Sequence, residues 1–172
     1  MLIQTQNKGK VTVGELSSVM GKVIPTANSN GVALEQLTAS YAIMTSKGIA
    51  AAETTTYLNS MMNELGKSGS KTDKLLRSAT GSSFKELMAS GKSLGEVLQI
   101  VQDEAGKSGL SLADMFGSAE AGKAAVTLLS NGVDGFNSSV QDMVNSVGAT
   151  QSAFETMDQT TEAKMQKAKN SI

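Results

Sequence analysis

Residues 93–109 have the sequence SLGEVLQIVQDEAGKSG, which contains the signals of one complete short helix. Ser93 followed by Glu96 matches a capping box, the pairing that commonly begins a helix. Gly109 follows the last turn, where glycine commonly ends one. The apolar side chains recur at the spacing of a single helix face: Leu94, Val97, Leu98 and Val101. The stretch therefore predicts a helix over 94–107 with one buried face.

The same apolar spacing recurs along nearly the whole chain, and no sustained alternation typical of strands interrupts it. Further capping boxes are expected at Thr12 with Glu15 and Ser83 with Glu86, and Ser111 with Asp114 is a weaker relative. The further helices are predicted over 12–28, 33–47, 50–66, 71–79, 83–90, 118–130 and 133–147, with a short helical turn over 110–117.

Glycine and proline mark the predicted helix ends. The glycines expected to end helices are Gly31, Gly48, Gly66, Gly91, Gly109, Gly132 and Gly148. Pro25, the only proline, is expected to kink or end the first helix near Ile24. The predicted fold class is all-α: a multi-helix bundle of about eight to nine short helices with short, Gly-terminated connections.

The expected organisation has three parts. Residues 1–11 are predicted to be a flexible N-terminal segment, and residues 12–148 the helical core, with a possible subdivision at the Gly/Ser/Lys-rich stretch 66–74. Residues 149–172 are predicted to be a polar C-terminal helix, over about 150–169, whose sparse apolar residues are Phe154, Met157, Met165 and Ala168. Such a narrow apolar seam suits either a helix that projects towards a partner or one docked by its edge.

Composition excludes several classes of protein. With 40% apolar and 18% charged residues the chain is neither disordered nor membrane-spanning, and no apolar run approaches the roughly 20 residues that cross a bilayer. The start, MLIQTQNKGK, lacks the apolar run of a signal peptide. The net charge is −1 and the basic residues are scattered along the sequence, so no specific nucleic-acid binding is expected.

No residue pattern supports catalysis or cofactor binding. The chain has no His and no Cys, which removes the commonest general base and the commonest metal ligands. Gly117–Lys123 (GSAEAGK) has the spacing of a phosphate-binding P-loop, but Ala124 stands where the hydroxyl residue is needed. Asp103 and Glu104 are adjacent and point about 100° apart on a helix. We therefore predict no catalytic, cofactor or metal site, no small-molecule substrate and no enzymatic activity.

Methionine is abundant in the predicted core. Aromatic residues make up only 3% of the chain, while ten residues are Met. Met is unbranched and repacks readily, so it suits either a helical core or an adaptable groove for a partner helix. We interpret the following as core residues, with the groove as the alternative: Met20, Met44, Met61, Met62 and Met88.

Several stretches, in a fixed order, then point to a family: GKVIPTA (21–27), GVALEQL (31–37), AIMTSKG (42–48), TTTYLNSMM (54–62), AEAGKAAVTLLSNG (119–132), GATQSAFETM (148–157) and KMQKAKNSI (164–172). The ordered set covers about residues 11–172 and resembles the core region of phage tail tape measure proteins. The resemblance carries no catalytic residue onto this chain. It matches the positions that serve as helix ends and close packing: Gly21, Pro25, Gly31, Gly48 and Gly122.

The resemblance implies a structural role. Tape measure proteins occupy the lumen of the phage tail tube, set its length, template polymerisation of the tube protein and are released as DNA passes. Implied partners are further copies of the chain, the tube protein, tail chaperones and the tail tip. The implied location is the virion tail, with the host bacterial cytoplasm during assembly. The chain is expected to be an excised domain or a remnant in a prophage, since even one continuous helix would span only about 260 Å.

Two other functions stay open from the residues alone. A stand-alone cytoplasmic helical adaptor would bind a partner helix in a Met-lined groove. A helical cell-wall hydrolase would need a Glu with a raised pKa in a deep cleft, which the rarity of aromatic residues argues against.

Overall fold

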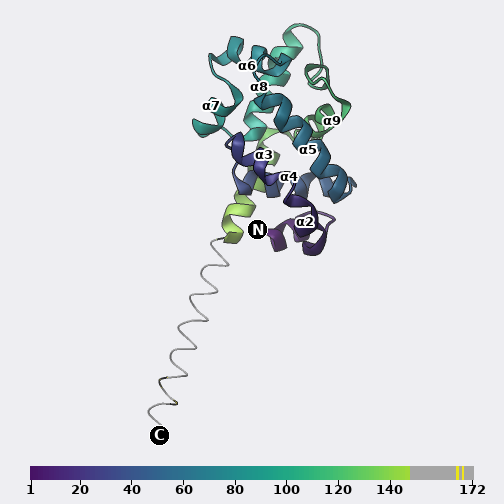
Figure 1. Ribbon diagram of the computed structural model, residues 1–172, viewed down its shortest axis with the longest axis vertical. Coiled ribbons are helices and arrows are strands. Elements are labelled where there is room, and N and C mark those ends of the chain that lie inside the picture. The colour runs from purple at the N-terminus through teal and green to yellow at the C-terminus, as the bar shows by residue number, and fades with distance from the viewer. Residues whose placement is uncertain (148–165, 167, 169–172) are drawn as a thin grey trace.

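The computed structural model describes residues 1–147, 166 and 168, and this part of the chain is all-α (Figure 1). This confirms the predicted fold class. The elements are α1 (Leu2–Lys8), α2 (Val13–Met20), α3 (Ile24–Ser29), α4 (Leu34–Ser46), α5 (Ala51–Gly66), α6 (Lys71–Thr80), α7 (Phe84–Ala89), α8 (Leu94–Lys107), the 3-10 helix η1 (Ala113–Met115) and α9 (Ala119–Leu128). A further helical stretch, residues 132–147, is called the 132–147 helix below.

The helices begin where their capping residues are. The three predicted capping boxes are present at the first residues of α2, α7 and α8. In the last of these, the Glu96 N–H donates to Ser93 Oγ at 3.1 Å and the Ser93 N–H donates to Glu96 Oε2 at 2.7 Å. Two orphan backbone donors are satisfied in this way at each helix start. Ser111 and Asp114 form the same reciprocal pair just before η1.

Glycines in the left-handed region end most of the helices. Predicted helix ends with positive φ are Gly31, Gly48, Gly91 and Gly109, and Gly69 and Gly81 share this conformation. Gly132 also has positive φ, but it is the first residue of the 132–147 helix, since α9 has already ended at Leu128. At Gly109 the following Leu110 N–H donates back to the Ala105 carbonyl at 3.0 Å, which closes the end of α8. Gly66 differs, since it is the last residue of α5. Gly148 lies outside the described residues.

The first predicted helix, 12–28, is two helices in the structure. α2 ends at Met20, and α3 begins at Ile24 with Pro25 in its first turn. A proline is tolerated there because its missing N–H would have no intrahelical partner. Pro25 therefore belongs to the start of a new helix, a few residues after the previous one has ended.

Residues 1–11, expected to be flexible, contain a docked helix. Thr5 of α1 is fully buried, and its hydroxyl donates to the Met1 carbonyl at 3.0 Å. At Gly9 the backbone approaches α4 so closely that a Cβ would lie 2.3 Å from Thr45 Oγ1. Lys8 Nζ lies 3.1 Å from Asp142 Oδ2 of the 132–147 helix. The segment is thus held between α4 and the 132–147 helix.

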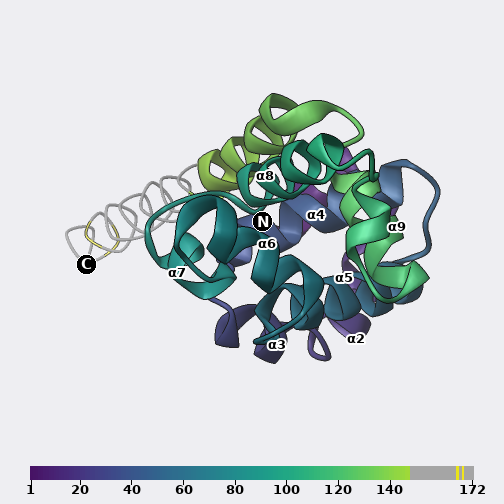
Figure 2. The ribbon, with the colours of Figure 1, turned by 90° about the horizontal axis from the view of Figure 1, so that it is seen from above.

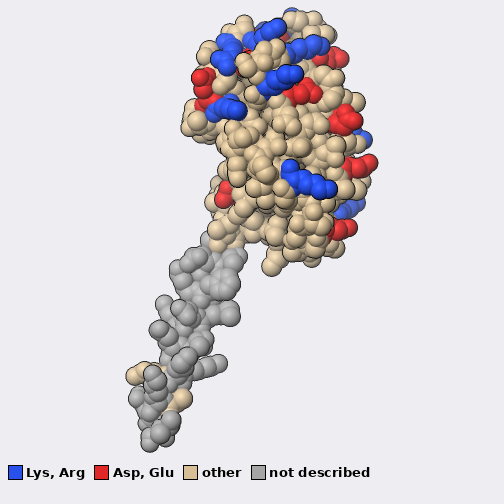
Figure 3. Space-filling view, viewed as in Figure 1, with Lys and Arg blue, Asp and Glu red and all other residues tan. Residues whose placement is uncertain are grey.

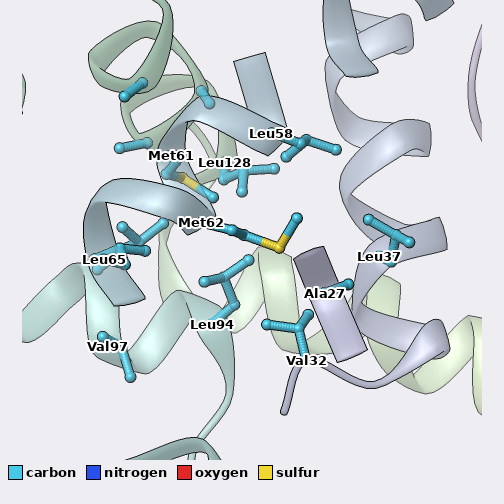
Figure 4. Packing of buried hydrophobic residues seen from close by; sticks show 14 of the residues in the cluster. Ala27, Val32, Leu37, Leu58, Met61, Met62, Leu65, Leu94, Val97 and Leu128 are labelled. Atoms are coloured by element: carbon cyan, nitrogen blue, oxygen red, sulfur yellow. The ribbon is translucent and has the colours of Figure 1, made fainter. Parts of the chain in front are cut away.

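One large hydrophobic cluster fills most of the interior (Figure 4), and a small second cluster consists of Ala39, Ala42 and Met143. Met61, Met62 and Leu65 of α5 are completely buried in the large cluster and meet side chains from both ends of the sequence, such as Ala27 of α3 and Leu128 of α9. All five methionines interpreted as core are buried: Met20, Met44, Met61, Met62 and Met88. The alternative of a groove lined by these methionines is therefore not supported.

Helix α5 lies at the centre of the body and contacts α2, α3, α4, α6, α7 and α9 (Figures 1 and 2). The cluster around it includes residues on both sides of the 66–74 stretch, for example Leu37 and Val101. The subdivision at 66–74 stays a prediction, although no break in the core marks it within residues 1–147. The predicted helix over 150–169 lies outside the described residues, apart from residues 166 and 168.

The 132–147 helix lies beside α8 (Figure 2). Its Phe136 is fully buried, and a Cβ added to Gly95 of α8 would lie 2.8 Å from Phe136 Cδ1. The absence of a side chain at position 95 is what lets the aromatic ring sit directly on the α8 backbone. This contact fixes the last described helix against the body.

Candidate interaction surface

The segment that resembles a P-loop, Gly117–Lys123, binds a carboxylate of the same chain at the place where a P-loop would bind phosphate. Helix α9 begins after Ser118, and Glu64 of α5 reaches the backbone in front of it. The Gly117 N–H donates to Glu64 Oε2 at 2.6 Å and the Ser118 N–H to Glu64 Oε1 at 3.0 Å. The Ser118 hydroxyl also donates to Oε1, at 2.7 Å. A helix N-terminus favours an anion, and here a carboxylate of the chain itself supplies it.

The lysine of this segment is also engaged within the chain. Lys123 is exposed to solvent, and its Nζ lies 5.4 Å from the centre of the Tyr57 ring. This is a cation–π distance. The backbone donors of Gly117 and Ser118 and the Lys123 ammonium therefore already have partners. These contacts hold α5 against α9 and give no reason to expect a phosphate ligand.

The candidate carboxylates occupy ordinary structural positions. Asp103 accepts a hydrogen bond from Gln99 Nε2 at 2.7 Å, and Glu104 pairs with Lys107 one turn along α8. Glu53 and Glu120 lie in the first turns of α5 and α9, where a carboxylate favours the helix dipole. Within the described residues, no three His, Cys, Asp or Glu side chains gather in a way that could hold a metal ion.

The titration properties of the described groups also follow from structural contacts. The Ser111 backbone N–H holds the pKa of Asp114 below its ordinary value, and the Thr12 N–H does the same for Glu15. The Gly69 N–H, helped by Arg77, lowers the pKa of Asp73. Burial raises the pKa of Tyr41 to about 12, against the opposing effect of its hydrogen bond with Thr55.

Two hollows in the surface of residues 1–147 lie on either side of α9. One groove, of about 620 Å³, runs between the C-terminal halves of α8 and α9. A second, of about 450 Å³, lies between α9 and the η1 segment. We call the two together the α9 grooves. Val126 lines both, and Leu110 lines the first; 49% and 47% of their surfaces are exposed.

Small residues keep the α9 grooves open. Gly106 lines the first groove, and a Cβ there would meet nothing within 4 Å. Gly122 lines the second, where a Cβ would lie 3.4 Å from Ala113. The Asp103 carboxylate borders the first groove. This surface is not evident from the sequence, because Val126 and Leu110 look like core residues. The available signal is Leu110, an apolar residue just after the helix end at Gly109.

Ile3 and Leu34 are exposed singly on α1 and α4, and Val144 and Val147 lie one turn apart on the 132–147 helix. Single exposed apolar residues are normal on protein surfaces. Among the helices of the described residues, none combines the length and the apolar character needed to span a bilayer. The α9 grooves are therefore the strongest candidate for a binding surface.

Comparisons with known proteins agree with the resemblance found in the sequence. The chain is 42% identical over 171 residues to a probable tape measure protein of Clostridium phage phiCD119, a match that covers 96% of this chain. The chain spans only 18% of the length of that relative. No solved structure matches the present chain. A family model described as phage-related minor tail protein matches residues 1–117. The chain therefore belongs to the phage-related minor tail protein family.

Proposed function

We propose that this chain is a helical module of a tape measure protein that takes part in tail assembly and tail-length determination through contacts between helices. The observation that carries the proposal is the identity to a probable tape measure protein along nearly the whole chain. The module would act in the lumen of the tail tube in the virion, and in the host cytoplasm during assembly. Its partners would be further copies, the tube protein, tail chaperones or the tail tip.

The α9 grooves are the surface through which we propose that the module contacts another tail protein. The exposed Val126 and Leu110 offer apolar contact, and the glycines leave room for an inserted side chain. Asp103 at the border favours a partner that carries a Lys or Arg beside its apolar residues. An amphipathic helix of a tail protein, with one basic residue flanking its apolar face, has this chemistry.

The length that this module adds to the tail depends on whether it stays a packed body or extends into one continuous helix. A continuous helix would add at most about 260 Å, whereas a body of short, antiparallel-packed helices adds far less. Removing the matching segment, in frame, from the full tape measure gene should therefore shorten the tail by much less than this limit. Electron microscopy of purified tails gives the change in length. Tails of unchanged length would contradict a role in length determination.

The contact surface is tested separately by charge insertion. Leu110→Glu combined with Val126→Glu should reduce the yield of complete tails, because a carboxylate in each groove opposes an apolar partner. Leu34→Glu is the matched control, since Leu34 is similarly exposed, at 44%, on α4. Circular dichroism of the isolated chain should show both variants folded. Normal tail yield for the double variant, or an equal loss for the control, would remove the α9 grooves from the proposal.

A further inference from the structure

The structure gathers basic side chains at one end of the body. Six exposed residues of α6, α7 and the adjoining loops form this surface, which we call the basic pole: Lys67, Lys71, Lys74, Arg77, Lys85 and Lys92. Figure 3 shows several Lys and Arg side chains, with Asp and Glu side chains among them, at the end of the molecule where α6 and α8 lie in Figure 1. Residues 67–92 contain only two acidic residues, so this segment carries a net charge of +4 in a chain of net charge −1.

Most of the positive charge of the basic pole is left unpaired by the fold. Asp73 is buried and bonded to Arg77, at 2.9 Å, and to the Gly69 N–H. Glu86 accepts from the Ser83 N–H at 2.7 Å as part of a capping box. The pKa of Asp114 is lowered mainly by its hydrogen bonds from Ser111 and also by the charge of Lys71, so Lys71 has an acidic neighbour. Within residues 1–147, the remaining lysines of the pole take part in no ion pair: Lys67, Lys74, Lys85 and Lys92.

The chemistry of the pole selects the kind of partner. No large apolar side chain is exposed between residues 67 and 92, and Phe84 is fully buried. A protein interface needs apolar or aromatic anchors at its centre, and single-stranded nucleic acid is usually held by stacking on exposed aromatic rings. The phosphate backbone of a duplex needs neither, because lysines bind it by charge and by release of counterions.

We propose that the basic pole binds the phosphate backbone of double-stranded DNA, without preference for sequence. Exposed hydroxyls of Ser68 and Ser78 stand among the lysines and add donors of the kind that contact phosphate oxygens. The pole shares no residue with the α9 grooves. The two surfaces therefore have separate partners, and the DNA contact does not rest on the proposed role of the grooves.

The experiment measures binding of the complete chain to a fluorescent random-sequence duplex of about 30 base pairs, by anisotropy, from about 20 to about 200 mM salt. The pole variant K74Q/K85Q/K92Q is compared with K10Q/K22Q/K47Q, which removes equal charge from exposed lysines elsewhere. We expect the pole variant to bind at least about tenfold more weakly at low salt, with a salt dependence reduced by roughly two to three phosphate contacts. The control should stay within about twofold of the parent chain.

Three outcomes would overturn the proposal. The parent chain shows no binding at the lowest salt, or the control variant loses as much affinity as the pole variant. The third is tighter binding, at equal charge concentration, of polyglutamate or of a single-stranded oligonucleotide than of the duplex, which would assign the pole to a different class of partner. Thermal unfolding of both variants confirms that they are folded.

Discussion

At the scale of single residues, two buried glycines inside helices differ in the space beside them: one has room for a methyl group and the other does not. Gly122, which the family resemblance matched as a close-packing position, leaves 3.4 Å between an added Cβ and Ala113. Gly95, which nothing in the sequence singled out, would place a Cβ 2.8 Å from the Phe136 ring. Close packing is therefore enforced at Gly95, and Gly122 has room for a methyl group. Both glycines look alike in the sequence because the neighbours that distinguish them, Ala113 and Phe136, lie outside their own helices.

Gly95→Ala and Gly122→Ala should consequently change the free energy of unfolding in opposite directions, or the second should leave it unchanged. The first should lower the free energy of unfolding by about 1–3 kcal/mol, because the methyl group displaces the Phe136 ring. The second should leave stability unchanged or raise it by up to about 1 kcal/mol, since alanine favours a helix interior. Urea unfolding followed by circular dichroism measures both. Equal effects of the two substitutions would contradict the close contact at Gly95.

Tyr41 makes stability depend on alkaline pH. The side chain is fully buried, bonds to Thr55, and has its pKa raised to about 12. Below about pH 10 the phenol is protonated in both folded and unfolded chains. Between about pH 10 and 12 the unfolded chain loses this proton first, so folded stability should fall by roughly 2–3 kcal/mol over that range.

The measurement compares urea unfolding at about pH 9 and about pH 11.5 for the parent chain and Tyr41→Phe. The lysines also titrate in this range, and the variant, which keeps them, isolates the tyrosine. Thr55 retains a hydrogen bond to the Ala51 carbonyl in either chain, at 2.9 Å in the parent structure. The parent should lose more stability than the variant; an equal loss would show that Tyr41 does not control the alkaline transition.

At the scale of elements, local signals set where most helices begin and end. Capping boxes and left-handed glycines act on backbone groups within one turn, so α7 and α8 agree with the sequence to within a residue. The exceptions are α1 and the break at residues 21–23. Helix α1 has no capping hydrogen bond from a side chain at its start and is only seven residues long. Such a helix is unstable alone, and it depends on contacts with α4 and the 132–147 helix.

Deletion of residues 1–9 should therefore destabilise the whole body. The deletion removes the buried Thr5, the partly buried Leu2 and the pair between Lys8 and Asp142. We expect a loss of about 1–3 kcal/mol, mostly from the apolar surface of α4 that becomes exposed. Thermal unfolding of the truncated chain measures it. An unchanged midpoint would support the flexible N-terminal segment that the sequence suggested.

At the scale of the whole molecule, contacts between distant segments hold the helices in one body. Glu64 of α5 binds the start of α9, and Gly95 of α8 receives Phe136 of the 132–147 helix. The Glu64 contact and the shared cluster cross the 66–74 stretch, where the sequence suggested a subdivision. The helices before and after this stretch bury each other's apolar faces in the shared cluster.

Unfolding should accordingly occur in one cooperative transition. Leu16→Ala and Val101→Ala, on opposite sides of the 66–74 stretch, should each shift the same calorimetric transition, by roughly 2–5 kcal/mol for the leucine and less for the valine. Equal calorimetric and van't Hoff enthalpies would support a single unit. Two transitions, each moved by only one of the substitutions, would instead establish two domains.

The sequence by itself determined the helices, their caps, the buried methionines and the family, because these depend on spacing and on residues close in the chain. Only the tertiary structure decided that residues 1–11 dock, that Gly95 is the tight contact, that Glu64 occupies the P-loop-like turn, and that scattered lysines form the basic pole. The physical reason is that most of these features join residues far apart in the chain, such as Lys8 and Asp142, whose charged atoms lie 3.1 Å apart. Local propensity carries no information about which faces of the finished helices will meet.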